Sequence, residues 1–172
     1  MLDNRQPAPD LTRVVVAIDP AVTSGEDSDE TGIVAAGLGV DGRAYVLADR
    51  SCRLSPDGWA RRAVAVFDDL AADLVVAEVN NGGDLVEQTI RTVRRTIPYR
   101  KVHASRGKQT RAQPVAALYE QGRVSHVEAF PDLEEQLTSW TPESGTSPDR
   151  LDALVWALTE LMLGTQREAY VY

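Results

Sequence analysis

The sequence holds few of the residues from which disulfides and soft-metal sites are built. Among its 172 residues are one cysteine and two histidines, so the chain has no internal disulfide and offers neither a cysteine-based zinc site nor a histidine-rich metal centre. The longest apolar runs, such as 14–18 and 74–77, are far shorter than the ~18 residues that span a bilayer. The polar, proline-bearing N-terminus lacks the apolar stretch of a signal peptide. We expect a protein of a reducing compartment that is neither secreted nor inserted in a membrane.

The composition is that of an ordinary globular domain. Hydrophobic residues make up 43% of the chain and charged residues 26%, which excludes a disordered or collagen-like chain. A length of 172 residues indicates one domain with a hydrophobic core of its own. We predict a disordered lead-in over residues 1–12, a folded domain over 13–164 and a C-terminal tail over 165–172.

Charge is distributed unevenly along the chain. The net charge of −8 argues against a nucleic-acid partner. Residues 91–123, however, hold nine basic residues and one acidic residue, Glu120, a charge of +8 that leaves −16 for the rest of the chain. This basic segment has two interpretations, an electrostatic footprint for phosphate or a solvated helix face followed by a loop. Charge alone leaves both open.

Five β-strands are predicted, over residues 13–19, 32–40, 43–50, 73–79 and 99–104. The first and the fourth are almost entirely apolar, which is typical of strands buried on both faces. The second and the third flank Asp41 and Gly42, the strongest short signal for a β-hairpin. The first three strands are therefore expected to form an antiparallel meander.

Helices are predicted between and after these strands. Ser55 and Pro56 begin a helix whose apolar residues follow the 3.6-residue period, and a second helix, with Leu85 and Ile90 facing inward, ends before Pro98. Further helical segments are expected over 112–121, 131–140 and 147–163. With right-handed crossovers, this order predicts an α/β protein with a mixed five-stranded sheet, three antiparallel N-terminal strands and helices on both faces.

Four acidic residues occupy positions that a plain hydrophobic core would not favour. Asp19 ends the first buried strand, and Glu78 lies near the end of the fourth. A carboxylate in such a run is costly to desolvate without compensation. If the two strands are parallel neighbours, both carboxylates meet at the edge where open sheets bind ligands. Asp149 and Asp152 lie three residues apart in the first turn of the last helix, on one side of it.

Clustered carboxylates repel one another, and a divalent cation is the usual compensation. Oxygen-only ligands suit Mg²⁺ or Mn²⁺, and two such ions about 3.5–4 Å apart would activate a water and stabilise the leaving oxygen of a phosphodiester. Structural alternatives stay open. Asp149 and Asp152 also suit a helix dipole, and Asp19 suits a turn at a strand end. Such an alternative is weakest for Glu78, which apolar residues flank.

The motifs around these acids carry a family resemblance. The matching stretches are VVVAIDPAVTSG (14–25), ETGIVAAG (30–37), YVLADRS (45–51), VVAEVNNGGDLV (75–86), GKQTRAQPVAALYEQGRVSH (107–126), LEEQL (133–137) and SPDRLDALVWALTEL (147–161). In this order they resemble the nuclease domain of phage large terminases, the DNA-packaging motors of tailed phages. The resemblance runs from about residue 13 to 164, although the Asp-x-x-Asp-Ala of the last stretch also looks like RuvC-type resolvases.

The resemblance implies an RNase H-like fold and a metal-dependent endonuclease that cuts concatemeric double-stranded DNA when genome packaging starts and ends. It implies that four acids hold two Mg²⁺ or Mn²⁺ ions and that three basic residues lie near the DNA backbone, the acids being Asp19, Glu78, Asp149 and Asp152 and the basic residues Arg106, Lys108 and Arg111. The implied partners are double-stranded DNA, the terminase ATPase domain, the small terminase and the portal, in the cytoplasm of the host.

The sequence departs from complete large terminases in one respect. The Walker A pattern G-x-x-x-x-G-K-[ST] of their ATPase is absent, because Gly107 and Lys108 have neither the upstream glycine nor a following Ser or Thr. We therefore expect a C-terminal nuclease domain without the ATPase. Two rival interpretations remain. One is a RuvC-like junction resolvase or transposition nuclease, and the other is a non-catalytic module that docks on DNA or a portal through residues 91–123.

Overall fold

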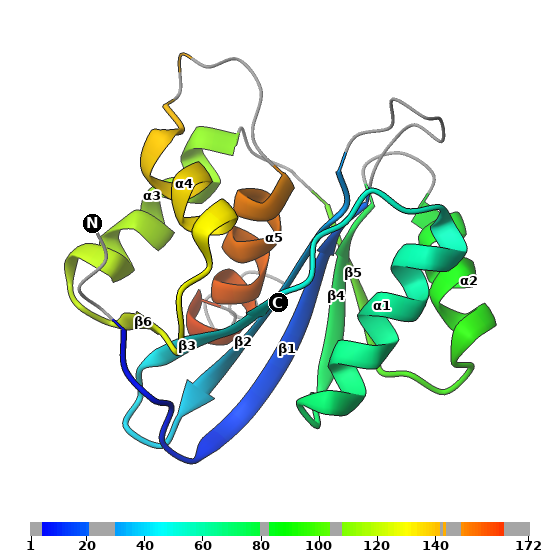
Figure 1. The fold of residues 1–172 in the computed structure, drawn as a ribbon, viewed down its shortest axis with the longest axis horizontal. Helices are drawn as coiled ribbons and strands as arrows, with labels where there is room; N and C mark the ends of the chain where they lie inside the picture. The colour runs from blue at the N-terminus through cyan, green and yellow to red at the C-terminus, as the bar shows by residue number, and fades with distance from the viewer. Residues whose placement is uncertain are drawn as a thin grey trace, which may run out of the picture.

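A six-stranded mixed sheet organises the protein. The computed structural model describes residues 5–20, 30–79, 83–103, 108–141, 143 and 149–163, with the backbone alone at 83–84 and 108–110. Within these ranges the strand order is β5-β4-β1-β2-β3-β6 (Figure 1). The strands are β1 (Leu11–Asp19), β2 (Gly32–Gly39), β3 (Ala44–Asp49), β4 (Leu74–Glu78), β5 (Tyr99–Val102) and β6 (Val124–His126).

The strand pairing confirms the predicted meander. β1 pairs with β2, and β2 with β3, in antiparallel orientation, whereas β4 lies parallel to β1 on its other side and β5 lies parallel to β4. The hairpin between β2 and β3 turns at Asp41 and Gly42, and Gly42 has a φ of +80°, a left-handed conformation that glycine adopts at little cost.

Two features differ from the predicted sheet. β6 makes a sixth strand, parallel to β3, where five were predicted. Its three residues are too few to display a strand period, so only the pairing with β3 defines it. β1 begins at Leu11, two residues before the predicted start.

Residues 5–10, expected within the disordered lead-in, contact the sheet. The Gln6 amide donates to the His126 carbonyl at 3.1 Å, and the Gln6 side chain donates to the Tyr45 hydroxyl at 2.9 Å.

Helices cover both faces of the sheet, as predicted (Figure 1). On one face lie α1 (Pro56–Asp69) and α2 (Gly83–Val93), and on the other lie α3 (Lys108–Glu120), α4 (Pro131–Ser139) and α5 (Asp149–Leu158), which continues as a π-helical turn, Thr159–Leu163. Side chains alternate along β1, so that Val16 and Ile18 pack in the core beneath α1 and α2 and Val15 and Ala17 pack in the core beneath α5.

The helix signals in the sequence match the structure in most places. Ser55 caps α1 by accepting a hydrogen bond from the Gly58 amide at 3.3 Å. On α2, Ile90 is fully buried as predicted, but Leu85 is 67% exposed, so its predicted inward orientation is wrong. α3 begins at Lys108, before the predicted residue 112. Among the described helices, none combines the length and hydrophobicity that crossing a bilayer requires.

The start of α5 contacts the backbone of β2 directly. A methyl group on Gly32 would lie 2.1 Å from the carbonyl oxygen of Asp149 and 3.2 Å from the Cβ of Ala153. These separations are shorter than van der Waals contact, so only glycine allows α5 to approach β2 this closely.

Gly32→Ala is therefore expected to displace the start of α5 and to lower the free energy of unfolding by about 1–3 kcal/mol. Urea unfolding measures this loss. Gly37→Ala is the matched control on the same strand, because its added methyl would meet the side-chain ends of Leu11 and Leu47, which can rotate away. Equal losses in the two variants would contradict the close approach of α5 to Gly32.

Candidate metal centre

The pairing of β1 with β4 places two carboxylates side by side. The last paired residues of the two strands are Ile18 and Ala77, and Asp19 and Glu78 follow them directly. Along each strand alternate residues share a face, and Ala17 and Val76 belong to the core beneath α5. Asp19 and Glu78 therefore also face α5, at the carboxyl ends of two parallel strands. The pairing of β1 with β4 also confirms that the first and fourth predicted strands are parallel neighbours.

α5 brings the third carboxylate. Asp152 is 4% exposed and Glu78 is 8% exposed, and each of Asp19, Glu78 and Asp152 offers a carboxylate oxygen within 4.8 Å of the others. We call these three residues the acidic cluster. Oxygen ligands at this spacing suit a hard divalent cation such as Mg²⁺ or Mn²⁺.

Asp149 lies beside the acidic cluster and outside it. It is not among the residues whose oxygens lie within 4.8 Å of one another, yet its charge is close enough to act on Asp19. The sequence placed Asp149 and Asp152 on one side of the last helix. Of the four predicted metal ligands, the structure thus brings three together and leaves Asp149 at the rim.

The surroundings of Asp19 disfavour the loss of its proton. Burial, followed by the negative charges of Glu78, Asp152 and Asp149, raises the pKa of Asp19 from 3.8 to about 10. In the metal-free protein at neutral pH, the Asp19 carboxyl therefore keeps its proton and shares a hydrogen bond with Glu78. A divalent cation would take the place of this proton, because it compensates the same negative charge. The donor set and its electrostatics thus fit a divalent metal.

The three predicted DNA contacts have different outcomes. Arg106 lies outside the described residues, and for Lys108 only the backbone, at the start of α3, is described. The Arg111 side chain is turned inward and is 11% exposed, with Nη1 3.8 Å from Oε1 of Glu78. Its guanidinium lies 5.0 Å from the centre of the Trp156 ring. Arg111 therefore lies against the acidic cluster, inside the domain.

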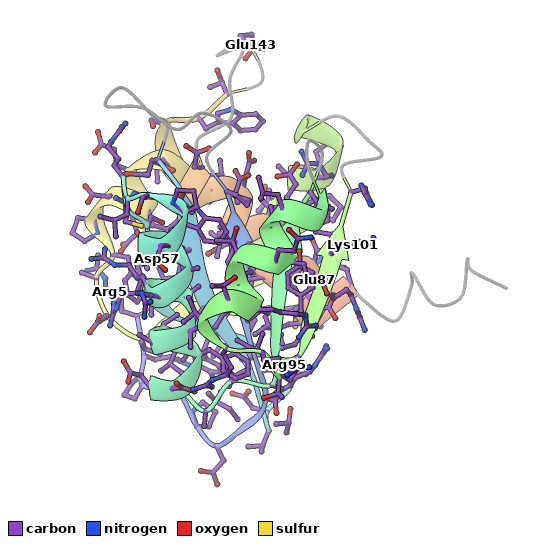
Figure 2. The ribbon with its side chains drawn as sticks, turned by 90° about the vertical axis from the view of Figure 1, so that its right-hand side faces the viewer. Arg5, Asp57, Glu87, Arg95, Lys101 and Glu143 are labelled. Atoms are coloured by element: carbon purple, nitrogen blue, oxygen red, sulfur yellow. The ribbon has the colours of Figure 1, made fainter. Side chains whose placement is uncertain are left out.

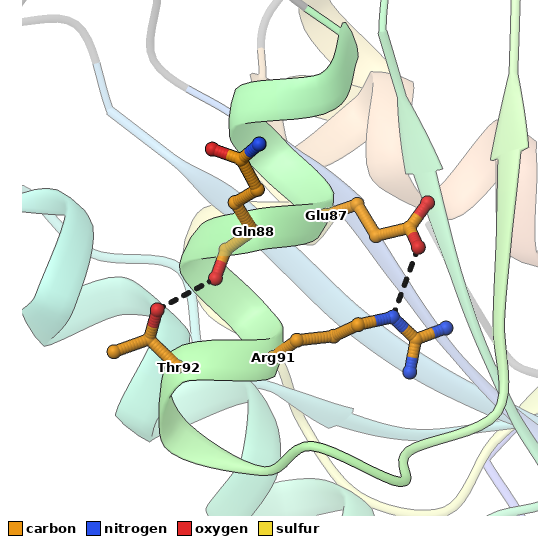
Figure 3. A pocket seen from close by; sticks show the side chains of 4 residues that line it. All are labelled: Glu87, Gln88, Arg91 and Thr92. Carbon is orange, nitrogen blue, oxygen red and sulfur yellow. Dashed lines mark hydrogen bonds and ion pairs between the residues drawn. The ribbon is translucent and has the colours of Figure 1, made fainter.

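Much of the basic segment is engaged within the molecule. Arg91 pairs with Glu87 at 2.9 Å beside a shallow hollow on α2 (Figure 3), Arg94 pairs with Asp68, and Arg100 donates to the buried Glu160 at 2.6 Å. Arg95 and Lys101 are exposed beside α2 and β5 (Figure 2). A phosphate-binding surface would therefore depend on a few exposed basic residues of this segment, such as Arg95 and Lys101.

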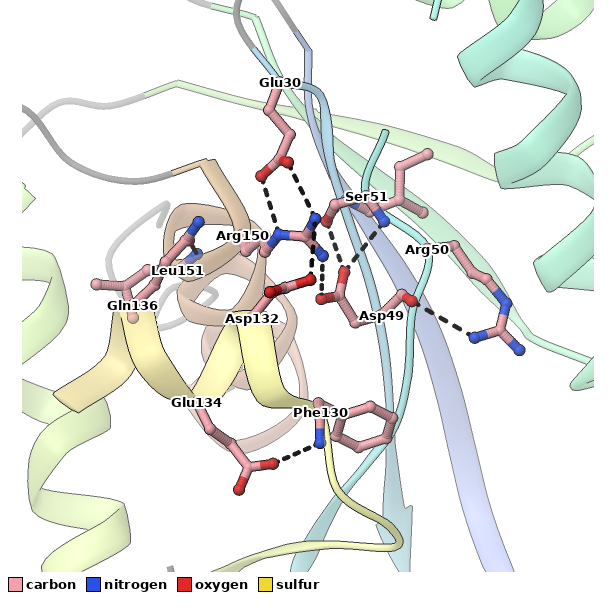
Figure 4. Close-up of polar contacts among 11 residues, drawn as sticks. Glu30, Asp49, Arg50, Ser51, Phe130, Asp132, Glu134, Gln136, Arg150 and Leu151 are labelled. Carbon is pink, nitrogen blue, oxygen red and sulfur yellow. Dashed lines mark hydrogen bonds and ion pairs between the residues drawn. The ribbon is translucent and has the colours of Figure 1, made fainter. Parts of the chain in front are cut away.

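Sequence reasoning missed an anchor at the start of α5. Arg150 lies between the two helix aspartates, and its guanidinium bonds to Glu30 at 2.9 and 3.0 Å and to Asp49 at the end of β3 (Figure 4). Glu30 lies two residues before β2, and the neighbouring acids Asp27 and Asp29 lie outside the described residues. The sequence does show a cation, Arg150, among the acids of SPDRLDA. Its acidic partners are distant in sequence, so no local pattern identifies them.

The proton on Asp19 makes the stability of the metal-free protein depend on pH. Because the folded state binds this proton more tightly than the unfolded state, stability falls as pH rises from about 4 towards the folded pKa of about 10. Asp19→Asn removes this contribution, so its unfolding free energy should fall less steeply with pH. Urea unfolding between about pH 6 and 9 measures the slopes, with Asp57→Asn, an exposed carboxylate on α1, as control. Equal slopes in Asp19→Asn and wild type would contradict the raised pKa.

Loss of the Arg150 anchor should be costly. Arg150→Gln leaves the largely buried carboxylates of Asp49 and Glu30 without their cation, and breaking such a pair typically costs about 3–5 kcal/mol. Chemical denaturation measures the change. Arg61→Gln breaks an exposed pair with Asp57 and should cost less than about 1 kcal/mol. Similar costs for the two variants would show that Arg150 anchors nothing.

Comparison with known proteins gives one family match and several structural matches. The profile of the terminase RNaseH-like domain matches residues 16–161. No curated protein sequence matches the chain. Among solved structures, the large terminase nuclease of thermophilic phage G20c with bound zinc aligns with a TM-score of 0.66 at 16% identity, over 91% of this chain and 94% of that one. The same nuclease also matches in structures with bound magnesium and with bound cobalt.

Two further structures extend the comparison. The large terminase of bacteriophage HK97 aligns with a TM-score of 0.68 at 12% identity, over 90% of this chain and 40% of that protein. RuvC of Thermus thermophilus aligns with a TM-score of 0.52 at 17% identity, over 89% and 96% of the two chains. These similarities establish the RNase H-like α/β fold that the motifs implied. Since the family profile covers most of the chain, the protein belongs to the terminase RNaseH-like domain family.

Proposed function

We propose that this chain is the nuclease domain of a phage or prophage large terminase and that it cuts double-stranded DNA by metal-dependent hydrolysis. The observation that carries the proposal is the convergence of Asp19, Glu78 and Asp152, whose carboxylate oxygens lie within 4.8 Å of one another. The family match and the likeness to a terminase nuclease solved with zinc, magnesium and cobalt support it.

The acidic cluster would hold Mg²⁺ or Mn²⁺, and Asp149 at the rim would help to bind a second ion. Bound there, the ions would supply an activated water and stabilise the negative charge of the leaving oxygen. The role of the chain is to hold the ligands rigidly. Asp19 and Glu78 are fixed by paired strands, and Asp152 is fixed by the anchor of α5. Because water is the nucleophile, no covalent intermediate with the protein is required.

Substrate and partners follow the same proposal. The substrate would be concatemeric double-stranded DNA, cut when genome packaging starts and ends, with Arg106 and Lys108 near its backbone. The chain spans 40% of the HK97 large terminase, so an ATPase domain of the same terminase is the partner we propose, together with a small terminase and a portal, in the cytoplasm of the host.

Cleavage of supercoiled plasmid in Mg²⁺ or Mn²⁺ tests the proposal. Asp19→Asn, Glu78→Gln and Asp152→Asn each remove a ligand and should slow nicking by at least about 100-fold, since even outer partners of metal ligands contribute roughly 10–100-fold. Asp149→Asn should slow it less, by about tenfold. Chelation of the metal should abolish nicking, whereas Asp57→Asn, on the exposed side of α1, should cut like wild type.

Other outcomes would redirect the assignment. Undiminished nicking by the three cluster variants would refute the site. Faster cleavage of four-way junctions than of linear duplex would favour a junction resolvase of the RuvC kind. Salt-sensitive DNA binding without cleavage in any divalent metal would favour a docking module.

A further inference from the structure

Arg111 connects the acidic cluster to α5. It projects from the first turns of α3, and its guanidinium lies against the face of the Trp156 ring, 5.0 Å from the ring centre. Trp156 is 2% exposed and follows Asp152 by four residues, so the two lie on the same side of α5. The guanidinium thus lies between the indole ring and Glu78, with Nη1 3.8 Å from Oε1 of Glu78.

The hydrogen-bonding state of Arg111 is unusual for a buried cation. Nε and Nη1 are inaccessible to solvent and have no hydrogen-bond partner among the described atoms. The distance of 3.8 Å from Nη1 to Glu78 Oε1 is too long for a hydrogen bond. Burying a charge whose N–H donors have no acceptor costs free energy. No hydrogen bond from Nε or Nη1 to Glu78 offsets this cost. Coulomb attraction to the carboxylates acts over such a distance.

The charge of the cluster explains why a cation would be kept there. Three carboxylates converge within 4.8 Å, and their negative charges repel one another at that spacing. Arginine suits such a position better than lysine, because its charge persists when buried and its flat guanidinium stacks on an aromatic ring.

We propose that Arg111 is a positioning residue that acts as a built-in counter-charge, holding the acidic cluster together in the metal-free protein and weakening its affinity for divalent cations. This inference rests on the proposed metal site. Arg111 supplies part of the positive charge that a metal would bring, so it stabilises the metal-free state relative to the loaded one. A metal ion would then bind less tightly, and leave more readily, than it would beside the same acids without Arg111.

The test measures Mn²⁺ affinity by titration calorimetry and thermal stability with and without Mn²⁺. Arg111→Met should bind Mn²⁺ on the order of tenfold more tightly than wild type, and its thermal midpoint should fall more in the metal-free than in the loaded protein. Arg111→Lys retains a cationic group without the stacked guanidinium, so its affinity should lie closer to that of wild type than to that of Arg111→Met. Arg13→Met is the matched control, because it removes a cation from the buried Glu160 at the other end of β1. It should lower both midpoints equally and leave the affinity unchanged.

A second arm needs no metal. In the metal-free protein, Glu78→Gln should reduce the destabilisation caused by Arg111→Met by at least half, whereas it should add independently to that of Arg13→Met. Unchanged or weaker Mn²⁺ binding by Arg111→Met, or an undiminished destabilisation in the Glu78→Gln background, would overturn the counter-charge. If wild type binds no Mn²⁺, the proposed function fails by itself, and the metal-free arm still decides the role of Arg111.

Discussion

β1 and β4 run parallel and in register, and the geometry of the candidate site depends on that pairing. Ile18 is paired with Ala77, so the next residue of each strand is a carboxylate on the face beneath α5. A shift of one residue would turn Glu78 to the opposite face, towards α1 and α2. Valines and alanines fill both faces of these strands, so a slip would change the close packing against the helices on each side.

The third carboxylate depends on a separate constraint, the attachment of α5. Gly32 lets the helix start contact β2, and Arg150 joins it to Glu30 and to the end of β3. Both contacts act within one turn of Asp152. Preorganised ligands favour metal binding, since little freedom remains to be lost. The same rigidity forces like charges together, which lowers stability unless a proton, a cationic side chain or a metal compensates them.

The pairing of charges likewise depends on contacts between residues that are distant in sequence. The basic segment of residues 91–123 looks like one patch when charges are counted along the chain. In the folded protein four of its seven arginines lie beside acids of different elements, namely Glu87 on α2, Asp68 on α1, Glu160 after α5 and Glu78 in the cluster. Net charge over a segment does not show which residues have acidic neighbours. For this reason the count of charges did not indicate that the Arg111 side chain lies largely buried beside Glu78.

Local patterns were sufficient for the strands of the meander, the Gly42 hairpin, the cap of α1 and the carboxylates at the ends of two buried strands, because each depends on residues close together in sequence. The brief strand β6, the exposure of Leu85 and the early start of α3 left no periodic signal of their own. The sequence by itself determined which acids were available and on which elements they lay. Tertiary structure alone decided that three of them meet, that Asp149 stays at the rim and that Arg111 and Arg150 have their present partners, because those contacts join residues from distant parts of the chain and depend on how α3 and α5 pack on the sheet.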